Sequence, residues 1–415
     1  MKALIVDPAV HSPGGHHYGA VKRLQTELAR LYIEAPCLGS VFAEPATVSD
    51  LACTPTFSSS VYGRDYSSPR EFKLRVDCTS RELSRALRRH GAWPDILVLP
   101  CCDQVLAASV AEVLRRRPWK PAPQILMWLL YGPHHLLAPD DRAAETFGAE
   151  SRRAFTSLLE AAGERQRIDA YCETDALAAF YRGLLPFDVS VAPGAGMALP
   201  AEIPALPGAD HRPNVTMIGF ANRSKGYRLL PQAIQNVLPR EGTSTFTIHG
   251  IVSGSDAEDE VWIFDRLGCL GPRVTSRCDV LSEADYLGLL SRADLLLLPY
   301  DPDIYRARGS GVVSEARRLG IPIIAPSECA FARPAFDEGW GVAFSDYSSE
   351  GLADAIVEAL GRLSALRTRA AAVAASTKDE LSSILQGTVE AAHSRHPHGG
   401  AGTIRRLLGR ALKAK

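Results

Sequence analysis

Two glycines and two histidines follow the first apolar segment of this 415-residue chain. They are Gly14, Gly15, His16 and His17, in the sequence PGGHHYGAV, just before a stretch with helical spacing. Small residues between a strand and a helix let backbone N–H groups approach an anion at the helix N-terminus. The segment is not a G-x-G-x-x-G fingerprint. An ordinary turn would use the same glycines for a positive φ angle, so both interpretations stay open here.

A second histidine pair occupies a similar place further along the first half. His134 and His135 follow the apolar run 125–131, ILMWLLY. A lone histidine is usually structural, and adjacent histidines point in different directions. Two such pairs, each directly after a predicted strand, favour contact between at least one of them and a substrate. No H-E-x-x-H pattern accompanies them, so we expect no bound metal.

A pair of cations follows the first apolar segment of the second half. Arg223 and Lys225 lie in the sequence GFANRSKGYRLL, in a glycine-flanked turn that opens a predicted helix. Two positive charges beside the free N–H groups of a helix end are suited to a diphosphate. A solvated turn rich in arginine and lysine is the competing interpretation.

The most specific pattern is the sequence LLLLPYDPDIYRARGSGVVSEARRLGIPIIAP. Its apolar run predicts a buried strand that ends at Tyr300, followed by a loop that carries Tyr305, Arg306 and Arg308. The string Asp301–Asp303 looks like a metal-binding D-x-D. A proline turn after a strand produces the same letters, and we favour the turn.

Small residues open the helix that we expect after this loop. A helix that begins at 309–311, with Ser310 and Gly311, exposes successive N–H groups to a phosphate. Glu315 lies one turn further along, where a carboxylate can accept hydrogen bonds from two ribose hydroxyls. The string GSGVVS also mimics a dinucleotide-binding fingerprint, but it stands too far from its strand for the tight turn of that motif.

The elements that must position these residues follow from the hydrophobic pattern. Short apolar runs alternate with helix-length amphipathic stretches, which predicts an α/β fold of two doubly wound domains with parallel sheets. The stretch from Met197 to Asn214 holds four prolines and shows neither the apolar spacing of a helix nor that of a strand. We therefore expect an interdomain linker there. Ligands of such sheets bind at the carboxyl ends of the strands, where the patterns above fall.

The domain boundaries follow from these changes of pattern. We assign 1–200 to an N-terminal domain, 201–214 to the linker and 215–363 to a C-terminal domain. Residues 364–394 are expected to form a C-terminal helical segment, and 395–415 a basic amphipathic tail. A serine- and proline-rich stretch, 49–69, is expected to be irregular.

The composition narrows the class of protein. The chain is 46% hydrophobic and 22% charged with a net charge of −1, which excludes disorder of its bulk. The apolar run 125–131 is far shorter than the roughly 20 residues of a membrane span. The nine cysteines form no C-x-x-C pair, which indicates reduced thiols. Because the N-terminus enters a predicted strand without the apolar core of a signal peptide, we expect a cytoplasmic protein.

The C-terminal tail is basic. Six of the 46 cationic residues and none of the 47 acidic ones lie from Arg395 onward, which leaves the rest of the chain at −7. Within 403–415, TIRRLLGRALKAK, apolar residues recur at helical spacing with cations between them. Such a helix suits an anionic membrane surface, which would place the protein at the inner face of the membrane. A helix docked on the protein, or a solvated tail, is the alternative.

Taken together, these motifs resemble the retaining glycosyltransferases of the GT-B fold, family 4. The match consists of the glycine pair after the first strand, R-x-K-G after the first strand of the second half, and P-Y-D-P…Y-R-x-R-x-S-G-V-x-x-E-A…G-x-P. It runs from Met1 to Leu363 and is strongest from Val215 to Pro326. The resemblance implies two Rossmann-like domains facing across a cleft, with the acceptor on the first and the donor on the second.

The resemblance also implies an activity and its participants. The enzyme would be a hexosyltransferase that moves a sugar from a nucleotide-diphosphate sugar to a saccharide, lipid-linked or other hydroxyl acceptor. It would use no metal, no further cofactor and no nucleic acid. Retention would occur by attack on the same face of the sugar, with the departing phosphate taking the proton of the acceptor.

Individual residues acquire roles by the same resemblance. Arg223 and Lys225 would neutralise the diphosphate, and Glu315 would hold the ribose. The implied donor-binding set is Gly14, Gly15, Arg223, Lys225, Arg308, Ser310, Gly311, Val312 and Glu315. The implied catalytic residues are His134, His135, Arg223 and Lys225, and the acceptor-side residues are His16 and His17.

The chain departs from the family at one position. The family often has two glutamates eight positions apart, and here the earlier position is Ala307, which leaves only Glu315. The arginine-rich form of this loop suggests that Arg308 replaces the missing group. Two other functions therefore stay in view: a nucleotide-sugar epimerase on a related fold, and a scaffold that binds nucleotide sugars without turnover.

Overall fold

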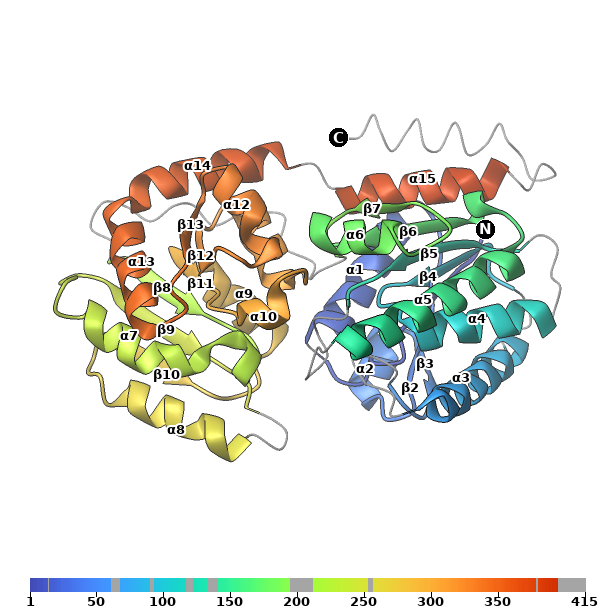
Figure 1. The fold of residues 1–415 in the computed structure, drawn as a ribbon, viewed down its shortest axis with the longest axis horizontal. Coiled ribbons are helices and arrows are strands. Elements are labelled where there is room, and N and C mark those ends of the chain that lie inside the picture. The colour runs from blue at the N-terminus through green and yellow to red at the C-terminus, as the bar shows by residue number, and fades with distance from the viewer. Residues whose placement is uncertain are drawn as a thin grey trace. The chain divides into compact units, whose positions relative to one another are not determined.

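A computed structural model describes residues 1–13, 15–60, 68–89, 93–116, 122–132, 141–194, 212–252, 257–377 and 380–394. These residues form two compact units, each with helices packed around one parallel β-sheet (Figure 1). The first unit contains the described residues of 1–173, 177–194 and 380–394, and the second contains those of 174–176 and 212–377. The predicted α/β class with two doubly wound sheets is confirmed.

The first unit is built on a seven-stranded sheet with the strand order β3-β2-β1-β4-β5-β6-β7. All of its strand pairs are parallel. The inner strands are short, apolar and fully buried, as expected where helices cover both faces. The strands are β1 Ala3–Val6, β2 Cys37–Ser40, β3 Cys53–Phe57, β4 Ile96–Leu99, β5 Gln124–Trp128, β6 Ile168–Cys172 and β7 Val189–Val191.

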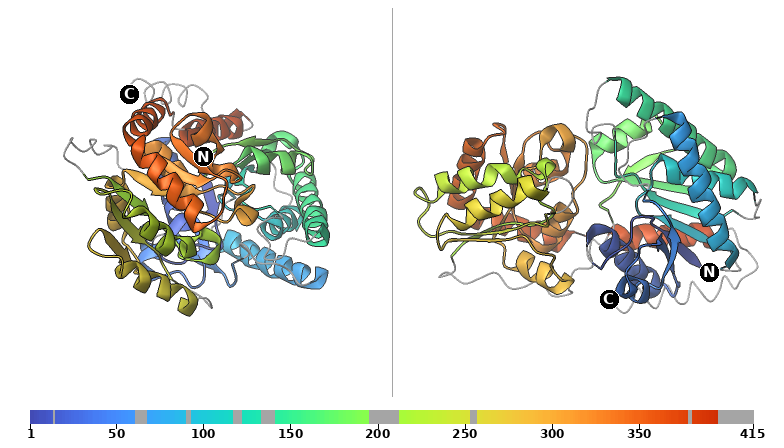
Figure 2. Two further views of the ribbon diagram at one scale, coloured as in Figure 1. Left: turned by 60° about the vertical axis from the view of Figure 1, so that its left-hand side comes forward. Right: turned by 90° about the horizontal axis from the view of Figure 1, so that it is seen from below.

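Helices flank this sheet on both faces (Figure 2). Helices α3, α4 and α5 pack side by side, and α1 lies on the face that carries Ile5 and Val98. The helices between the strands are α1 Gly15–Arg30, α2 Pro45–Asp50, α3 Pro69–Arg89, α4 Gln104–Arg116, α5 Asp141–Ala162 and α6 Asp175–Arg182.

The last described helix, α15 (Glu380–Ser394), belongs to the first unit although it follows the whole second unit in sequence. Its apolar residues recur at helical spacing and join the core that α1 forms on the sheet. Polar contacts fix its position, because Ser382 donates a hydrogen bond to Glu27 (2.6 Å) and Thr388 donates one to Asp169 (3.2 Å). The buried apolar residues of α15 are Leu381, Leu385, Val389 and Ala392.

The second unit is built on a six-stranded parallel sheet with the order β10-β9-β8-β11-β12-β13. The strands are β8 Asn214–Met217, β9 Thr245–His249, β10 Val274–Arg277, β11 Leu295–Leu297, β12 Ile323–Pro326 and β13 Gly341–Phe344. The helices are α7 Leu230–Val237, α8 Ala257–Gly268, α9 Glu283–Ser291, α10 Pro302–Tyr305, α11 Gly311–Leu319, α12 Arg333–Asp337, α13 Ser349–Gly361 and α14 Leu363–Ser376.

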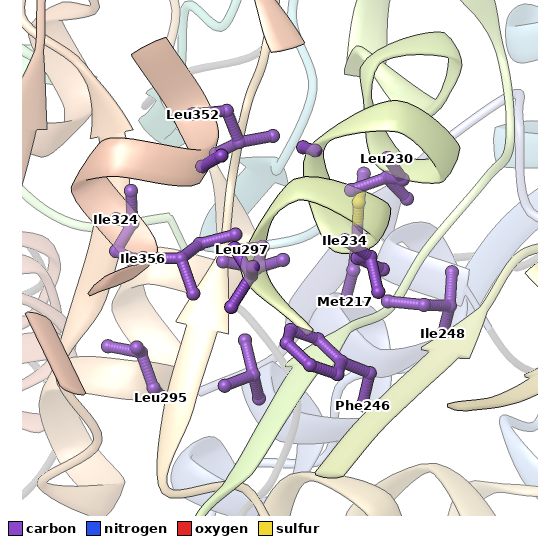
Figure 3. Close-up of a cluster of buried hydrophobic side chains, with 14 of the residues drawn as sticks. Met217, Leu230, Ile234, Phe246, Ile248, Leu295, Leu297, Ile324, Leu352 and Ile356 are labelled. Atoms are coloured by element: carbon purple, nitrogen blue, oxygen red, sulfur yellow. The ribbon is translucent and has the colours of Figure 1, made fainter. Parts of the chain in front are cut away.

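Successive residues of the central strands face opposite sides of this sheet. Leu295 and Leu297 of β11 point toward α7 and α13, where Ile234 and Ile356 meet them (Figure 3). Leu296 packs on the other face, in the core that contains α11. The alternation buries both faces of β11, which explains its uninterrupted apolar sequence.

Several expectations about chain segments need correction or fall outside the described residues. The stretch 49–69 is not wholly irregular, because it contains β3, whose Pro55 is tolerated on an edge strand. The segment 364–394 is divided between the two units, with α14 in the second and α15 in the first. The linker 201–214 lies outside the described residues except for 212–214, and the tail 395–415 lies outside them altogether.

Candidate functional site

The strand order places the loops after β8 and β11 side by side. The chain leaves β8 toward one edge of the second sheet and β11 toward the other, so this is the point where the direction of winding reverses. Crevices at such points bind ligands in doubly wound folds, because loops diverge there at the carboxyl ends of the strands. The predicted cation pair and the predicted helix opening both lie in these two loops.

The two loops touch through their backbones. Gly226 has a φ of +73°, and a Cβ atom there would lie 1.8 Å from the carbonyl oxygen of Pro299. Asp301 also donates its backbone N–H to the carbonyl of Ser224 (2.9 Å). Only glycine fits a left-handed backbone pressed against another chain segment. The sequence R-S-K-G therefore closes the first loop directly onto the second.

Lys225 reaches from the first loop into the second. Its Nζ donates a hydrogen bond to the hydroxyl of Tyr300 (2.9 Å) and lies 4.2 Å from the centre of the same ring. Burial alone would lower the pKa of Lys225, but the influence of Tyr300 and Tyr305 outweighs it and raises the pKa above its usual 10.5. The amine is therefore cationic at neutral pH. Arg223, by contrast, is exposed to solvent.

Aromatic rings support the second loop. Tyr300 contacts Tyr305 and Phe331, with ring centres 4.7 and 5.2 Å away. The guanidinium of Arg308 lies over the ring of Tyr305, 4.8 Å from its centre. Ala307, at the position of the missing glutamate, is buried. The loop thus presents Arg308 from a packed aromatic base.

Helix α11 begins at Gly311, as the sequence predicts, with Ser310 at its N-cap. The Ser310 side chain does not cap the helix, and its Oγ is inaccessible and without a hydrogen-bond partner among the described residues. The first N–H groups of any helix lack partners within the helix, and here they include those of Gly311 and Val312. No acidic residue lies in the first turn. The helix start therefore offers hydrogen-bond donors to an anion.

Glu315 lies one turn into α11 and is only 4% exposed. The hydroxyl of Tyr286, on helix α9, donates a hydrogen bond to Glu315 Oε2 at 2.5 Å. Burial and the negative charge of Glu315 hold the pKa of Tyr286 well above its usual 10. Tyr286 is therefore a stable donor, and the pair forms a buried charge-assisted hydrogen bond.

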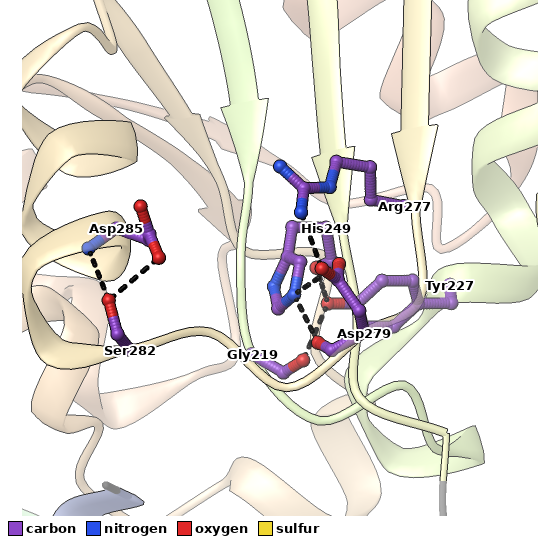
Figure 4. Close-up of polar contacts among 7 residues, drawn as sticks. All are labelled: Gly219, Tyr227, His249, Arg277, Asp279, Ser282 and Asp285. Atoms are coloured by element: carbon purple, nitrogen blue, oxygen red, sulfur yellow. Dashed lines mark hydrogen bonds and ion pairs between the residues drawn. The ribbon is translucent and has the colours of Figure 1, made fainter.

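Polar contacts also order the same sheet edge beyond β8 (Figure 4). His249 Nε2 lies 2.7 Å from the carbonyl oxygen of Asp279, and burial lowers the pKa of His249 below 6.5. The neutral ring therefore donates from Nε2. Tyr227 donates its hydroxyl to the carbonyl of His249 (2.7 Å), while Asp279 pairs with Arg277. These contacts fix the loop after β10, on which Val280 is 73% exposed.

The first unit has a second polar group at the corresponding place after β1. Asp7 is 1% exposed, and its Oδ2 lies 2.8 Å from His17 Nδ1. Asp7 also accepts the backbone N–H of Ala9 at 3.0 Å. A buried carboxylate that binds Nδ1 selects the tautomer with its lone pair on Nε2. His16 lies beside His17, with ring centres 4.1 Å apart.

Sequence reasoning missed both Asp7 and another carboxylate near it. Asp103 follows β4, the neighbour of β1, and burial raises the pKa of Asp103 to about 7. Its Oδ1 accepts the N–H of Leu106 (2.8 Å), so it also caps helix α4. Asp7 directly follows β1, and Asp103 comes shortly after β4, so the end of a buried apolar strand is the sequence signal that the two share, although it is a common one.

The structure therefore brings together part of the predicted site. Lys225, Arg308 and Ser310 belong to the two touching loops of the second unit, and Glu315 lies on the helix that follows them. Gly15 begins α1 in the first unit, with His17 on the same helix. Gly14, His134 and His135 lie outside the described residues. The functional roles of all these residues stay predictions.

Over the described part of the chain, no group of three or more His, Cys, Asp or Glu side chains is arranged to hold a metal ion. Among the helices of that same part, none combines the length and apolarity needed to cross a bilayer.

Comparison with known proteins identifies the fold. No protein-family model and no curated protein sequence matches the chain. Sucrose-phosphate synthase from Thermosynechococcus elongatus aligns with a TM-score of 0.67 at 16% identity, over 94% of this chain and 98% of that one. The glycosyltransferase WaaG, involved in lipopolysaccharide biosynthesis, aligns with a TM-score of 0.60 at 14% identity, over 93% and 100% of the two chains.

An enzyme of another class is also similar in fold. UDP-GlcNAc 2-epimerase from Neisseria meningitidis, bound to UDP-GlcNAc, aligns with a TM-score of 0.51 at 11% identity, over 94% and 99% of the two chains. The chain thus has a glycosyltransferase-like GT-B fold of two Rossmann-like domains, as the sequence predicts. At these identities the similarity shows the fold alone.

Proposed function

We propose that this protein is a glycosyltransferase that binds a nucleotide-diphosphate sugar on its second unit. The observation that carries the proposal is the position of Lys225. Its cationic amine is held by Tyr300 in the loop that leads to the start of α11, where Ser310 Oγ has no hydrogen-bond partner within the described part of the chain. A half-buried cation on a loop that leads to the free N–H groups of a helix start is suited to a diphosphate.

The other residues of the two loops complete this donor site. Arg223 and Arg308 add positive charge, and the backbone of 310–312 binds the phosphates. Glu315 accepts hydrogen bonds from the ribose. Charge develops on the diphosphate as the glycosyl bond breaks, and fixed cations and helix dipoles stabilise it without reorganising. We therefore propose that the reaction proceeds without a metal, and that EDTA leaves the rate unchanged.

The acceptor is proposed to bind the first unit. Gly15, His16 and His17 lie at the start of α1, after the first strand of that sheet. By the resemblance to family 4, Gly14 and Gly15 approach the donor, His16 and His17 lie on the acceptor side, and His134 or His135 contacts the transferred sugar. That resemblance also supports attack on the same face of the sugar and retention of configuration. The acceptor is proposed to be a saccharide, a lipid-linked sugar or another hydroxyl compound.

The Asp7–His17 pair supports one second candidate. An imidazole whose Nδ1 is fixed by a buried carboxylate is a suitable acid or base, and an epimerase needs such groups. Turnover distinguishes the two functions. An epimerase alters the sugar without any acceptor, whereas a transferase releases nucleoside diphosphate faster when the acceptor is present. A scaffold, for which the buried Ala307 argues, binds the nucleotide sugar and does neither.

A thermal-shift screen tests the donor site. UDP-, GDP-, ADP- and dTDP-sugars are compared with a CMP-sugar, which carries a single phosphate. A ligand at 100 times its Kd stabilises the fold by about 2.7 kcal/mol, which raises the melting temperature measurably. We expect one diphosphate class to stabilise the wild type and the CMP-sugar to have no effect.

Variants locate that binding. Lys225→Met keeps the length of the side chain and removes its charge, so we expect the affinity to fall by about 10- to 100-fold. Arg240→Gln is the matched control, because Arg240 is a cation of the same unit paired with Asp354 on the surface. Unaltered affinity in Lys225→Met, or an equal loss in Arg240→Gln, would disprove the site.

Membrane contact through 403–415 is a further part of the proposal. It rests on the sequence of that segment, which places cations between apolar residues at helical spacing. The full chain should sediment with vesicles of anionic lipid and not with vesicles of neutral lipid, while a chain that ends at 394 should sediment with neither. This would place the enzyme in the cytoplasm at the inner face of the membrane.

A further inference from the structure

One buried contact near the proposed donor site is not explained by packing alone. Tyr286 and Glu315 come from different helices, α9 and α11, and meet through a 2.5 Å hydrogen bond from the phenol to Oε2. Glu315 is only 4% exposed, so its charge requires partners. Tyr286 is partly buried against the same core as α11.

From this contact we infer that Tyr286 is a positioning residue, which orients the carboxylate of Glu315 toward the ribose of the nucleotide and so gives the site its preference for ribonucleotides. The inference rests on the proposed function, because it takes Glu315 as the group that meets the ribose. Tyr286 itself acts through Glu315.

The physical reason lies in the freedom of a glutamate side chain. The terminal torsion angle of a glutamate side chain has a broad distribution. A carboxylate with no fixed partner therefore rotates about its terminal bond. A carboxylate can accept hydrogen bonds from two ribose hydroxyls together only when its plane is fixed. A short hydrogen bond from a rigid phenol to one oxygen fixes that plane, and it leaves further lone pairs on the carboxylate to accept from the sugar.

Helix α9 is itself held in place where it carries Tyr286. Ser282 at its N-cap accepts the backbone N–H of Asp285 at 3.1 Å and donates its hydroxyl to the Asp285 carboxylate at 2.7 Å (Figure 4). The N–H of Tyr286 bonds the carbonyl of Ser282 at 2.9 Å. The first turn of α9 is therefore well ordered, so the phenol approaches Glu315 from a fixed backbone.

The test measures discrimination between two ligands instead of affinity alone. UDP, GDP or ADP, whichever stabilises the wild type, is titrated by calorimetry beside its 2′-deoxy analogue. We expect the wild type to prefer the ribonucleotide by about tenfold or more, as a charge-assisted hydrogen bond implies. In Tyr286→Phe the preference should fall to about threefold or less, chiefly because the ribonucleotide binds more weakly.

Matched variants separate positioning from stability. Tyr181→Phe removes another buried phenol, which donates to a backbone carbonyl in the first unit, and should leave the preference unchanged. In a Glu315→Ala chain, adding Tyr286→Phe should cause no further loss of preference. If Tyr286→Phe does not fold, Tyr286→Met removes the same hydroxyl with another apolar side chain, and its preference should fall equally.

The outcomes distinguish this inference from the function on which it rests. If Glu315→Ala abolishes the preference while Tyr286→Phe keeps it, the donor site stands and the inference is wrong. An additive loss in the double variant also overturns it. If none of the nucleotides binds the wild type, the proposed function itself fails.

Discussion

At the scale of single residues, a half-buried lysine and a buried histidine of the second unit differ in their charge. Lys225 keeps its charge because Tyr300 offers it both a hydroxyl and the face of an aromatic ring. His249, which is 2% exposed, is surrounded so that burial favours its neutral form. The charge of Lys225 agrees with its proposed role in binding a diphosphate, whereas the contacts of His249 support the structure.

The state of His249 predicts how stability depends on pH. The pKa of His249 is lowered in the folded protein, so below about pH 6.5 the unfolded chain binds a proton that the folded chain refuses. The free energy of unfolding should therefore fall as the pH falls from 7.5 to 5.5. Urea unfolding followed by circular dichroism should show a smaller fall in His249→Gln, whose amide keeps a donor.

The groups that face His249 permit a control for this measurement. They are Asp279 and Arg277, which pair with each other on the surface, and the pKa of Asp279 lies below its usual 3.8. Asp279 therefore keeps its charge throughout the range measured. If the wild type and His249→Gln lose stability equally between pH 7.5 and 5.5, other groups control the effect.

Residue types and spacing predicted the contents of the proposed donor site better than those of the first unit. Lys225, Ser310 and Glu315 could be found because each follows a recognisable strand in a distinctive motif. Asp7 was missed, since an aspartate at the end of an apolar strand is common and its partner His17 lies ten positions away. Only the fold shows that helix α1 brings the imidazole back to the carboxylate.

At the scale of elements, buried strands were easier to predict than edge strands. The apolar runs of β4, β5 and β11 are unmistakable because helices cover both of their faces. The edge strands β3 and β10 each expose part of their length, and their sequences CTPTF and VTSR carry no apolar run. Neither sequence therefore predicts a strand.

The packing of α15 predicts that the first unit depends on it. Leu385 is fully buried among residues of α1 and the sheet. Leu385→Ala should lower the free energy of unfolding of the first unit by about 2–5 kcal/mol, the usual cost of such a cavity. Hydrogen exchange should then show faster exchange in α1, β4 and β5.

Glu390→Ala, on the exposed face of the same helix, is the matched control and should leave exchange unchanged. Faster exchange confined to the second unit in Leu385→Ala would show that α15 stabilises a different part of the chain. No change anywhere would show that the first unit does not need it.

At the scale of the whole molecule, the two units are both built on parallel sheets but carry different chemical groups. The second unit presents Lys225 and Arg308, which suit an anionic leaving group. The first presents His17 on Asp7, which suits a proton transfer. Transferases and an epimerase share this fold, so the proposed function rests on these side chains and not on the fold.

The stereochemistry of the product tests the proposed mechanism of the whole enzyme. If the departing phosphate accepts the proton of the acceptor, the new bond keeps the anomeric configuration of the donor. Proton NMR of the first-formed product should then show retention, and His17→Gln should lower the rate only modestly. Inversion, together with near-complete loss of activity in His17→Gln, would identify His17 as the base and contradict the proposal.

The return of α15 to the first unit has a consequence for synthesis of the protein. Apart from Thr174–Ala176, the second unit is continuous in sequence, so the ribosome delivers its described residues from 212 onward in one uninterrupted stretch. The first unit lacks α15 from the time that β7 is synthesised until α15 emerges, which takes about 10–40 s at common rates of translation. During that interval the apolar residues of α1 and the sheet that α15 later buries are exposed, so a chaperone that binds the nascent chain is expected to bind there.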